Sequence, residues 1–86
     1  METLEEIIEY AKEMDYNDAE FFTNPSYATA FIGMTSDGRP VYDYDKMVDY
    51  LVKNQYMSFE EAREYIDFNV IDCYVPGMTP IVVYPV

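Results

Sequence analysis

The chain has 86 residues, enough for one domain with a single small core. Half of its residues are apolar and 17% are aromatic, a composition that excludes an intrinsically disordered chain. Seventeen acidic residues face five basic ones, giving a formal net charge of −12. A field of that sign repels nucleic acid and anionic lipid, so we expect no direct binding to either and expect a basic protein surface as the partner.

Targeting and redox signals are sparse. No apolar run approaches the ~18–20 residues that span a bilayer, and the acidic N-terminus lacks the basic start of a secretory signal. Cys73 is the single cysteine, which excludes an internal disulfide and a multi-cysteine zinc site. We therefore expect a cytoplasmic protein.

Residues 3–15 are predicted to form an amphipathic helix. Apolar residues recur at helical spacing from Leu4 to Met14, and Thr3 can cap the helix together with Glu6. Residues 16–27 show no sustained period and contain the turn-forming pair Asn24-Pro25. We expect a connecting loop there, with at most one helical turn at residues 18–22.

A β-hairpin is predicted over residues 28–43. The strand from Ala28 to Met34 is followed by Asp37-Gly38, a pair that suits a turn with positive φ. Pro40 opens the returning strand, which places that strand at a sheet edge or points the missing N–H outward.

Two further helices and a closing strand complete the predicted elements. Asp43 can cap a helix over residues 43–53, and Ser58 with Glu61 forms a capping box for a helix over residues 58–73 that ends before Pro76-Gly77. Residues 80–84 form an apolar strand. The predicted fold is α+β: a small antiparallel-rich sheet, made of the hairpin and the C-terminal strand, with three helices packed on one face.

Two blocks of sequence carry a resemblance. Residues 33–47 read Gly-Met-Thr-Ser-Asp-Gly-Arg-Pro-Val-Tyr-Asp-Tyr-Asp-Lys-Met, and residues 60–69 include Glu-Glu-Ala and Tyr-Ile-Asp-Phe-Asn. They resemble a group of small acidic proteins of bacterial and prophage genomes that share a G-T-x-D-G-R-x-V-Y-D-Y-D-K-M block and have no assigned activity. The resemblance implies a phage or mobile-element setting within a bacterial host cell. It divides the single domain into an acidic N-terminal helix and loop (1–27) and a family-like core (28–86).

Catalytic and metal-binding patterns are absent from the sequence. Without histidine, triads of the Ser-His-Asp or Cys-His type are excluded, and Cys73 falls on the expected buried stripe of the third helix. Asp43, Asp45 and Asp49 are spaced partly like a calcium loop, but Val48 stands where that loop needs glycine. We therefore predict no enzyme activity, no cofactor and no metal. A carboxylate-dependent enzyme would need a cleft that holds two carboxylates with separated pKa values.

The acidic residues gather at the front of the chain. The first 27 residues hold eight acids against Lys12 alone, a net charge of −7, whereas residues 28–57 have −1 and residues 58–86 have −4. Solubility alone does not require this concentration. On a helix that rises ~1.5 Å per residue, Glu2, Glu6, Glu9 and Glu13 form a ridge with ~4.5–6 Å steps, near the ~6.8 Å of two phosphate steps along a DNA strand. The predicted partner-binding residues are Glu2, Glu5, Glu6, Glu9, Tyr10, Glu13, Asp15, Tyr16, Asp18 and Glu20.

Ten tyrosines form the second surface signal. Tyr42, Tyr44, Tyr65 and Tyr84 are expected in or around the core. Five others have no obvious buried place, so they either extend an interface or cover the edges of a small core; these are Tyr10, Tyr16, Tyr27, Tyr50 and Tyr56.

These observations lead to two functional hypotheses. The first is a phage- or prophage-encoded acidic inhibitor that occupies the basic groove of a host nucleic-acid-binding defence nuclease, an anti-CRISPR or anti-restriction protein acting by nucleic-acid mimicry. The second is a housekeeping or scaffold protein-interaction module, monomeric or a homodimer, with no defence role.

Overall fold

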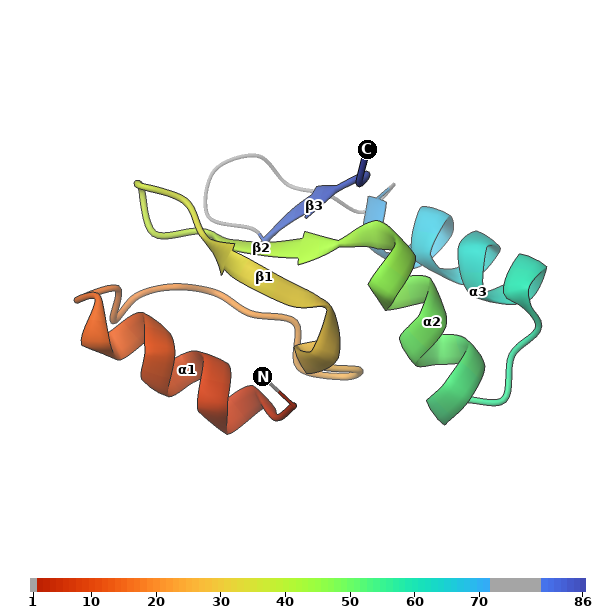
Figure 1. Ribbon diagram of the computed structural model, residues 1–86, viewed down its shortest axis with the longest axis horizontal. Helices are drawn as coiled ribbons and strands as arrows, with labels where there is room; N and C mark the ends of the chain where they lie inside the picture. Colours follow the sequence, from red (N-terminus) through yellow and green to blue (C-terminus); the bar gives the residue numbers. More distant parts are fainter. Residues whose placement is uncertain (1, 72–79) are drawn as a thin grey trace.

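The fold is α+β, as predicted, with three helices and a three-stranded sheet. Figure 1 shows the computed structural model, which describes residues 2–71 and 80–86, with Ile71 described by its backbone alone. The elements in chain order are α1 (Leu4–Glu13), the 3-10 turn η1 (Ala28–Ala30), β1 (Phe31–Met34), β2 (Pro40–Asp43), α2 (Tyr44–Asn54), α3 (Phe59–Ile66), the π-helical segment η2 (Asp67–Ile71) and β3 (Ile81–Val83).

The sheet has the order β1-β2-β3. β1 and β2 pair as an antiparallel hairpin, and β3 adds to the other side of β2 in the parallel direction, with Val41 opposite Ile81. Of the two alternatives predicted for Pro40, the edge strand is wrong, because β2 lies in the centre of the sheet. Proline is tolerated there since it is the first residue of the strand, before the pairing with β3 begins.

The hairpin turn follows the chemistry expected of Asp37-Gly38. Gly38 has a φ of 85°, its N–H donates to the Thr35 carbonyl oxygen at 3.1 Å, and the Arg39 N–H donates to Thr35 Oγ1 at 2.9 Å. The pairing of β1 and β2 is irregular between Phe31 and Gly33, which leaves Ile32 half exposed.

β1 begins later than predicted. Residues 28–30 form the 3-10 turn η1, not a strand, because Tyr27 adopts a left-handed conformation with a φ of 50° and its carbonyl accepts from the Ala30 N–H at 2.9 Å. The preceding residues 16–27 are a loop, as predicted, and the optional helical turn at residues 18–22 does not form.

α2 and α3 begin at the predicted caps. The Lys46 N–H donates to Asp43 Oδ1 at 3.0 Å, and Ser58 and Glu61 exchange both hydrogen bonds of a capping box at 3.1 Å each. The regular α3 helix ends at Ile66 and continues as η2, so it is shorter than the predicted 58–73. The predicted end at Pro76-Gly77 and the position of Cys73 lie outside the described residues.

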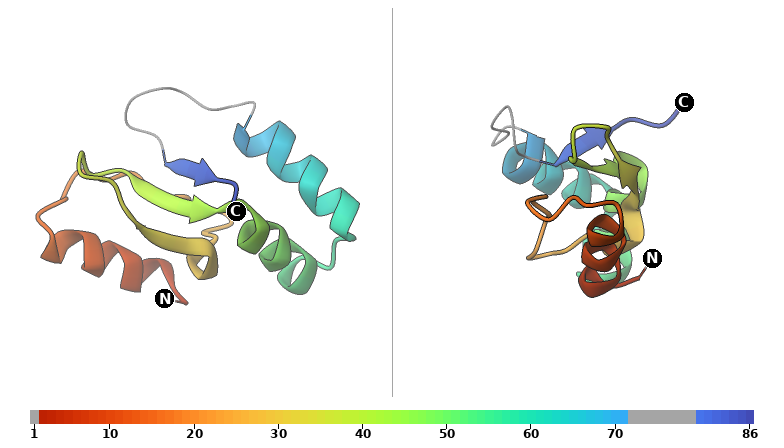
Figure 2. Two further views of the ribbon diagram at one scale, coloured as in Figure 1. Left: turned by 45° about the horizontal axis from the view of Figure 1, so that its top comes forward. Right: turned by 90° about the vertical axis from the view of Figure 1, so that its left-hand side faces the viewer.

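One hydrophobic core joins the helices to the sheet. Its fully buried side chains come from every helix and from β2, and α3 packs on α2 through Ala62 and Ile66. α1 runs along the β1 side of the sheet, opposite β3, while α2 and α3 pack together beyond the end of β2 (Figures 1 and 2). The core residues are Ile7, Tyr27, Ala28, Ala30, Tyr42, Tyr44, Met47, Val48, Leu51, Ala62 and Ile66.

The tyrosines divide differently from the prediction. Tyr42 and Tyr44 are buried as expected, but Tyr84 is 64% exposed. Tyr27, which had no obvious buried place, is 1% exposed, and its ring packs edge-on against Tyr50 at 5.6 Å. Local pattern missed Tyr27 because its burial depends on residues distant in the chain.

Candidate protein-interaction surface

The exposed side of α1 carries a shallow acidic depression. The helix presents Ile7 and Ala11 to the core, so its glutamates face outward. The depression has a volume of about 360 Å³ and is lined by Thr3, Glu5, Glu6, Glu9, Tyr10 and Glu13. We call it the α1 depression; five of the ten predicted partner-binding residues line it.

The carboxylates of this region are not neutralised within the described chain. All eight predicted acidic contact residues are exposed, and none of them forms an ion pair with another described residue. An ion pair does form between Lys53 Nζ and Asp49 Oδ2 at 2.9 Å, but it lies on α2. The negative field of the α1 depression is therefore directed toward solvent.

The spacing of the glutamates works against helix stability. Glu5, Glu9 and Glu13 follow each other at four-residue steps, which places like charges on neighbouring turns of α1. Each such pair destabilises an isolated helix by roughly 0.2–0.5 kcal/mol. Glu13 also lies in the last turn, where the helix dipole disfavours a negative charge.

Glu6 and Glu2 are tied to the start of the helix. Glu6 Oε1 accepts from the Thr3 hydroxyl at 3.2 Å and from the Glu2 N–H at 3.3 Å, while the Glu6 N–H donates to Thr3 Oγ1 at 3.2 Å. This capping arrangement fixes Glu6 at one end of the α1 depression, and Glu2 lies outside its lining.

Asp15, Asp18 and Glu20 follow the helix and do not line the depression. Asp15 ends α1 in a left-handed conformation with a φ of 66°, and its N–H donates to the Lys12 carbonyl oxygen at 3.0 Å. Together with the Tyr16 N–H bond to the Ala11 carbonyl oxygen at 2.9 Å, this is a Schellman motif. Asp18 and Glu20 are exposed on the loop.

The two predicted tyrosines have different environments. Tyr10 lines the depression and packs its ring edge-on against Phe31 of β1, with centroids 5.9 Å apart. Tyr16 makes an internal contact: its hydroxyl donates to the Ser36 carbonyl oxygen at 3.1 Å, and its ring lies against Gly38. Tyr16 thus fastens the end of α1 to the hairpin turn.

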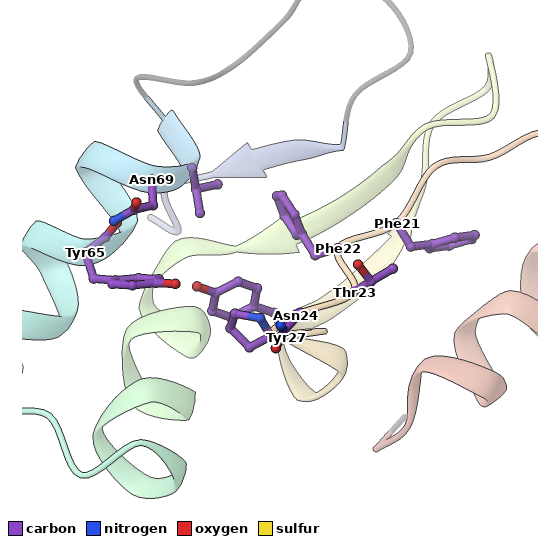
Figure 3. A pocket seen from close by; sticks show the side chains of 9 residues that line it. Phe21, Phe22, Thr23, Asn24, Tyr27, Tyr65 and Asn69 are labelled. Atoms are coloured by element: carbon purple, nitrogen blue, oxygen red, sulfur yellow. The ribbon is translucent and has the colours of Figure 1, made fainter.

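A second hollow was not anticipated from the sequence. It has a volume of about 250 Å³ and lies between the loop before η1 and the α3–η2 segment (Figure 3). Its lining is Phe21, Phe22, Thr23, Asn24, Pro25, Tyr27, Tyr65, Asn69 and Val70. We call it the Tyr27 pocket. The cluster of aromatic residues at 21–27 was the available signal, but only the fold brings it to α3.

Two buried phenols are left without hydrogen-bond partners. The hydroxyls of Tyr27 and Tyr42 are fully buried, and neither makes a hydrogen bond within residues 2–71 and 80–86. An unsatisfied buried polar group costs about 1–3 kcal/mol. Burial raises the pKa of Tyr42 to about 12; the Phe22 backbone acts in the opposite direction, although its contact falls short of a hydrogen bond. The pKa of Tyr27 is raised more than that of Tyr42. Burial is the main cause, and the neighbouring Tyr65 and Tyr50 add to it.

The chain matches no known protein family, no curated protein and no solved structure. The resemblance to prophage proteins therefore stays a prediction. In the two described ranges, no helix has the length and apolar character that a membrane crossing needs.

Proposed function

We propose that this protein is a phage- or prophage-encoded inhibitor that inserts the acidic side of α1 into the basic groove of a host nucleic-acid-binding defence nuclease, of the CRISPR or restriction type. It acts by nucleic-acid mimicry and performs no catalysis. The contact surface comprises the α1 depression and the acids that follow it, Asp15, Asp18 and Glu20.

One observation carries the proposal: the exposed carboxylates of α1 gather around a single base, Lys12, and none of them forms an ion pair with a described residue. Repeated glutamates at four-residue spacing weaken the helix that holds them, so solubility is a poor reason for placing them there. A basic partner supplies the missing counter-charges. The arrangement is then a binding surface that is complete only in a complex.

The dimensions of α1 suit a groove built for a nucleic-acid backbone. Glu5, Glu9 and Glu13 recur at ~6 Å along the helix axis, similar to the ~6.8 Å of two phosphate steps along one strand. Lysine and arginine side chains that normally neutralise phosphates would pair with these carboxylates. Tyr10, held by Phe31, adds a rigid aromatic contact beside the charges.

Binding to such a groove should be strongly dependent on salt. The charges on both partners are screened and their counterions are released on association, as in protein–DNA complexes. The experiment uses a panel of purified CRISPR effectors and restriction endonucleases, and measures DNA cleavage and binding of the full chain at low and moderate salt. We expect inhibition of at least one nuclease, with affinity falling by about tenfold or more as salt rises.

A matched pair of variants locates the contact. Glu5→Gln/Glu9→Gln removes two carboxylates from the α1 depression, whereas Glu60→Gln/Glu64→Gln removes an equivalent exposed pair at the same spacing from α3. The first should weaken inhibition by about tenfold, equivalent to ~1.4 kcal/mol, and the second should leave it nearly unchanged.

Three results would contradict the proposal. They are a panel with no inhibited nuclease, an equal loss in both double variants, or a stable homodimer that shields α1 from hydrogen exchange. The last would favour the scaffold module, because a dimer seam over α1 leaves no acidic surface for another protein.

A further inference from the structure

The Tyr27 pocket lies apart from the proposed contact surface. It is walled by the loop residues 21–25 and Tyr27 on one side and by Tyr65, Asn69 and Val70 on the other, and no residue of α1 lines it (Figure 3). A ligand there would bridge the loop that follows α1 and the α3–η2 segment. The pocket therefore concerns a different binding event from the acidic mimicry.

The Tyr27 hydroxyl supplies an unused hydrogen-bonding group. Tyr27 is 1% exposed, its hydroxyl has no partner, and Figure 3 shows that hydroxyl turned toward the Tyr65 hydroxyl across the hollow. Because burial raises its pKa, Tyr27 remains a neutral phenol at physiological pH. It can donate one hydrogen bond to an acceptor that enters the pocket.

Asn69 supplies a complementary acceptor. Its Nδ2 donates to the Tyr65 carbonyl oxygen at 3.0 Å, which leaves its amide oxygen available. Thr23 and Asn24 add further neutral polar groups to the rim. The pocket thus offers a donor deep inside and an acceptor nearer its mouth.

Charge and size narrow the class of ligand. No charged side chain is among the described residues that line the pocket, so a bound ion would lose water without gaining a counter-charge from them. The net charge of −12 further repels anions. Phe22 and Val70 provide an apolar wall, whereas the Phe21 ring is turned away from the hollow (Figure 3). A volume of about 250 Å³ lies below the ~300–1,000 Å³ of pockets for drug-sized ligands, which leaves room for one or two rings.

We propose that the Tyr27 pocket binds a small, neutral, planar ring compound whose edge carries an amide-like pair, with an acceptor for the Tyr27 hydroxyl and a donor for the Asn69 amide oxygen. Aromatic carboxamides and uncharged nucleobases share this chemistry. The ring packs between Phe22 and Tyr65, where aromatic surfaces contact one another favourably.

Three probes of similar size test the proposal on the full chain by titration of its amide NMR spectrum. Benzamide has the neutral amide edge, benzoate replaces it with a negative charge, and toluene has no polar edge. We expect benzamide to shift amides in residues 21–27 and 65–70 with millimolar affinity, and to bind at least about fivefold more tightly than either of the others.

Variants with matched controls assign the two polar contacts. Tyr27→Phe keeps the ring and removes the free hydroxyl, and Tyr42→Phe removes the other buried hydroxyl, which lies outside the lining. Asn69→Ala is matched by Asn54→Ala, whose Nδ2 makes the same bond to a carbonyl four residues earlier, at 3.0 Å, on α2. Tyr27→Phe and Asn69→Ala should each weaken benzamide binding about fivefold or more, while both controls bind like the wild type.

The proposal is overturned if benzamide binds no better than toluene, or if Tyr27→Phe and Asn69→Ala bind it as tightly as their controls do. A structure at saturating benzamide that shows only a water molecule on the Tyr27 hydroxyl would overturn it as well. If Tyr27→Phe alters the fold, Asn69→Ala and its control Asn54→Ala still test the proposal. Asn69 is exposed, so its replacement by alanine should leave the fold intact.

Discussion

α1 and α3 are built from the same local parts but serve the molecule differently. Each begins at a hydroxyl cap, Thr3 or Ser58, followed three residues later by a glutamate, and each buries two apolar residues. α3 places its buried residues against α2, and its Arg63 lies over the Phe59 ring at 5.6 Å. α1 lies at the sheet margin with an outer side rich in glutamate. Similar cap residues thus produce one helix that completes the core and one that displays charge.

The comparison shows which helix positions are constrained by packing within the protein and which are not. The buried residues of α3 are constrained by packing on α2, whereas the outer glutamates Glu5, Glu9 and Glu13 of α1 form no ion pair with a described residue. A surface with no internal partner is free to adapt to an external one, which is the condition that the proposed function requires.

The largest expected effect comes from truncating the buried isoleucine of each helix. Ile66→Ala and Ile7→Ala each remove a side chain that is 0% exposed, and such changes cost about 2–5 kcal/mol. We expect the larger loss for Ile66→Ala, because α3 packs on α2 within the core. Urea unfolding measures both; a larger loss for Ile7→Ala would show that α1 is the more tightly integrated helix.

Gly38→Ala should loosen the attachment of α1. Alanine at a φ of 85° is strained, and its Cβ would lie 3.0 Å from Tyr16 Cδ1. The left-handed conformation alone costs about 1–2 kcal/mol. Hydrogen exchange of α1 should accelerate more than that of α3, and Tyr16→Phe, which loses only the bond to Ser36, should give a milder version of the same pattern.

Removing the two caps compares the helices directly. Thr3→Ala and Ser58→Ala should each cost about 1 kcal/mol, with the larger loss at Ser58, which forms a reciprocal capping box with Glu61. At the other cap the Glu6 carboxylate instead accepts from the Thr3 hydroxyl and the Glu2 N–H. Thermal unfolding of the two variants measures this. Equal losses would mean that the α1 cap is as well formed as that of α3.

The α3 capping box also predicts a dependence on acid. The Ser58 backbone N–H first, and then its hydroxyl, hold the pKa of the Glu61 carboxyl below its usual value of 4.5. A lowered folded-state pKa contributes stability above the unfolded value, and that contribution is lost as the pH falls through the folded value. Glu61→Gln should therefore be less stable than the wild type near neutral pH, and the gap should close on acidification. A gap independent of pH would contradict this role.

The smallest effect is expected from the glutamate pairs. Glu5→Gln/Glu9→Gln removes both like-charge pairs at four-residue spacing from α1 and should stabilise the protein by roughly 0.2–0.5 kcal/mol for each pair. The gain should shrink with added salt, because these charges are exposed. Urea unfolding at two salt concentrations checks it, and a loss of stability would mean that the carboxylates have partners within the fold.

The sequence predicted most of what local chemistry controls. The caps at Thr3, Asp43 and Ser58 and the turn at Gly38 all form as expected, because each depends on residues within a few positions. Helical periodicity also identified Ile7 and Ala11 as buried residues of α1, but Met14, at the end of the same predicted stripe, is 43% exposed. The fold class followed from these elements.

What the sequence missed depends on distant contacts. The central place of β2 follows from its pairing with β3, and the burial of Tyr27 follows from Phe22 and Tyr50. No local period reports either. The acids of α1 were identifiable in advance, but the Tyr27 pocket was not, since its two walls are far apart in the chain.

The parallel pairing of β2 with β3 has a consequence for the order of folding. The β1–β2 hairpin and the α2–α3 pair join neighbouring segments. Val41 and Ile81, by contrast, can pair only when the long loop between them has closed. Closing so long a loop carries an entropic penalty that local contacts avoid, and distant pairings slow a folding reaction. A newly synthesised chain therefore leaves the β3 side of its central strand open until residues 81–83 are available to pair with it.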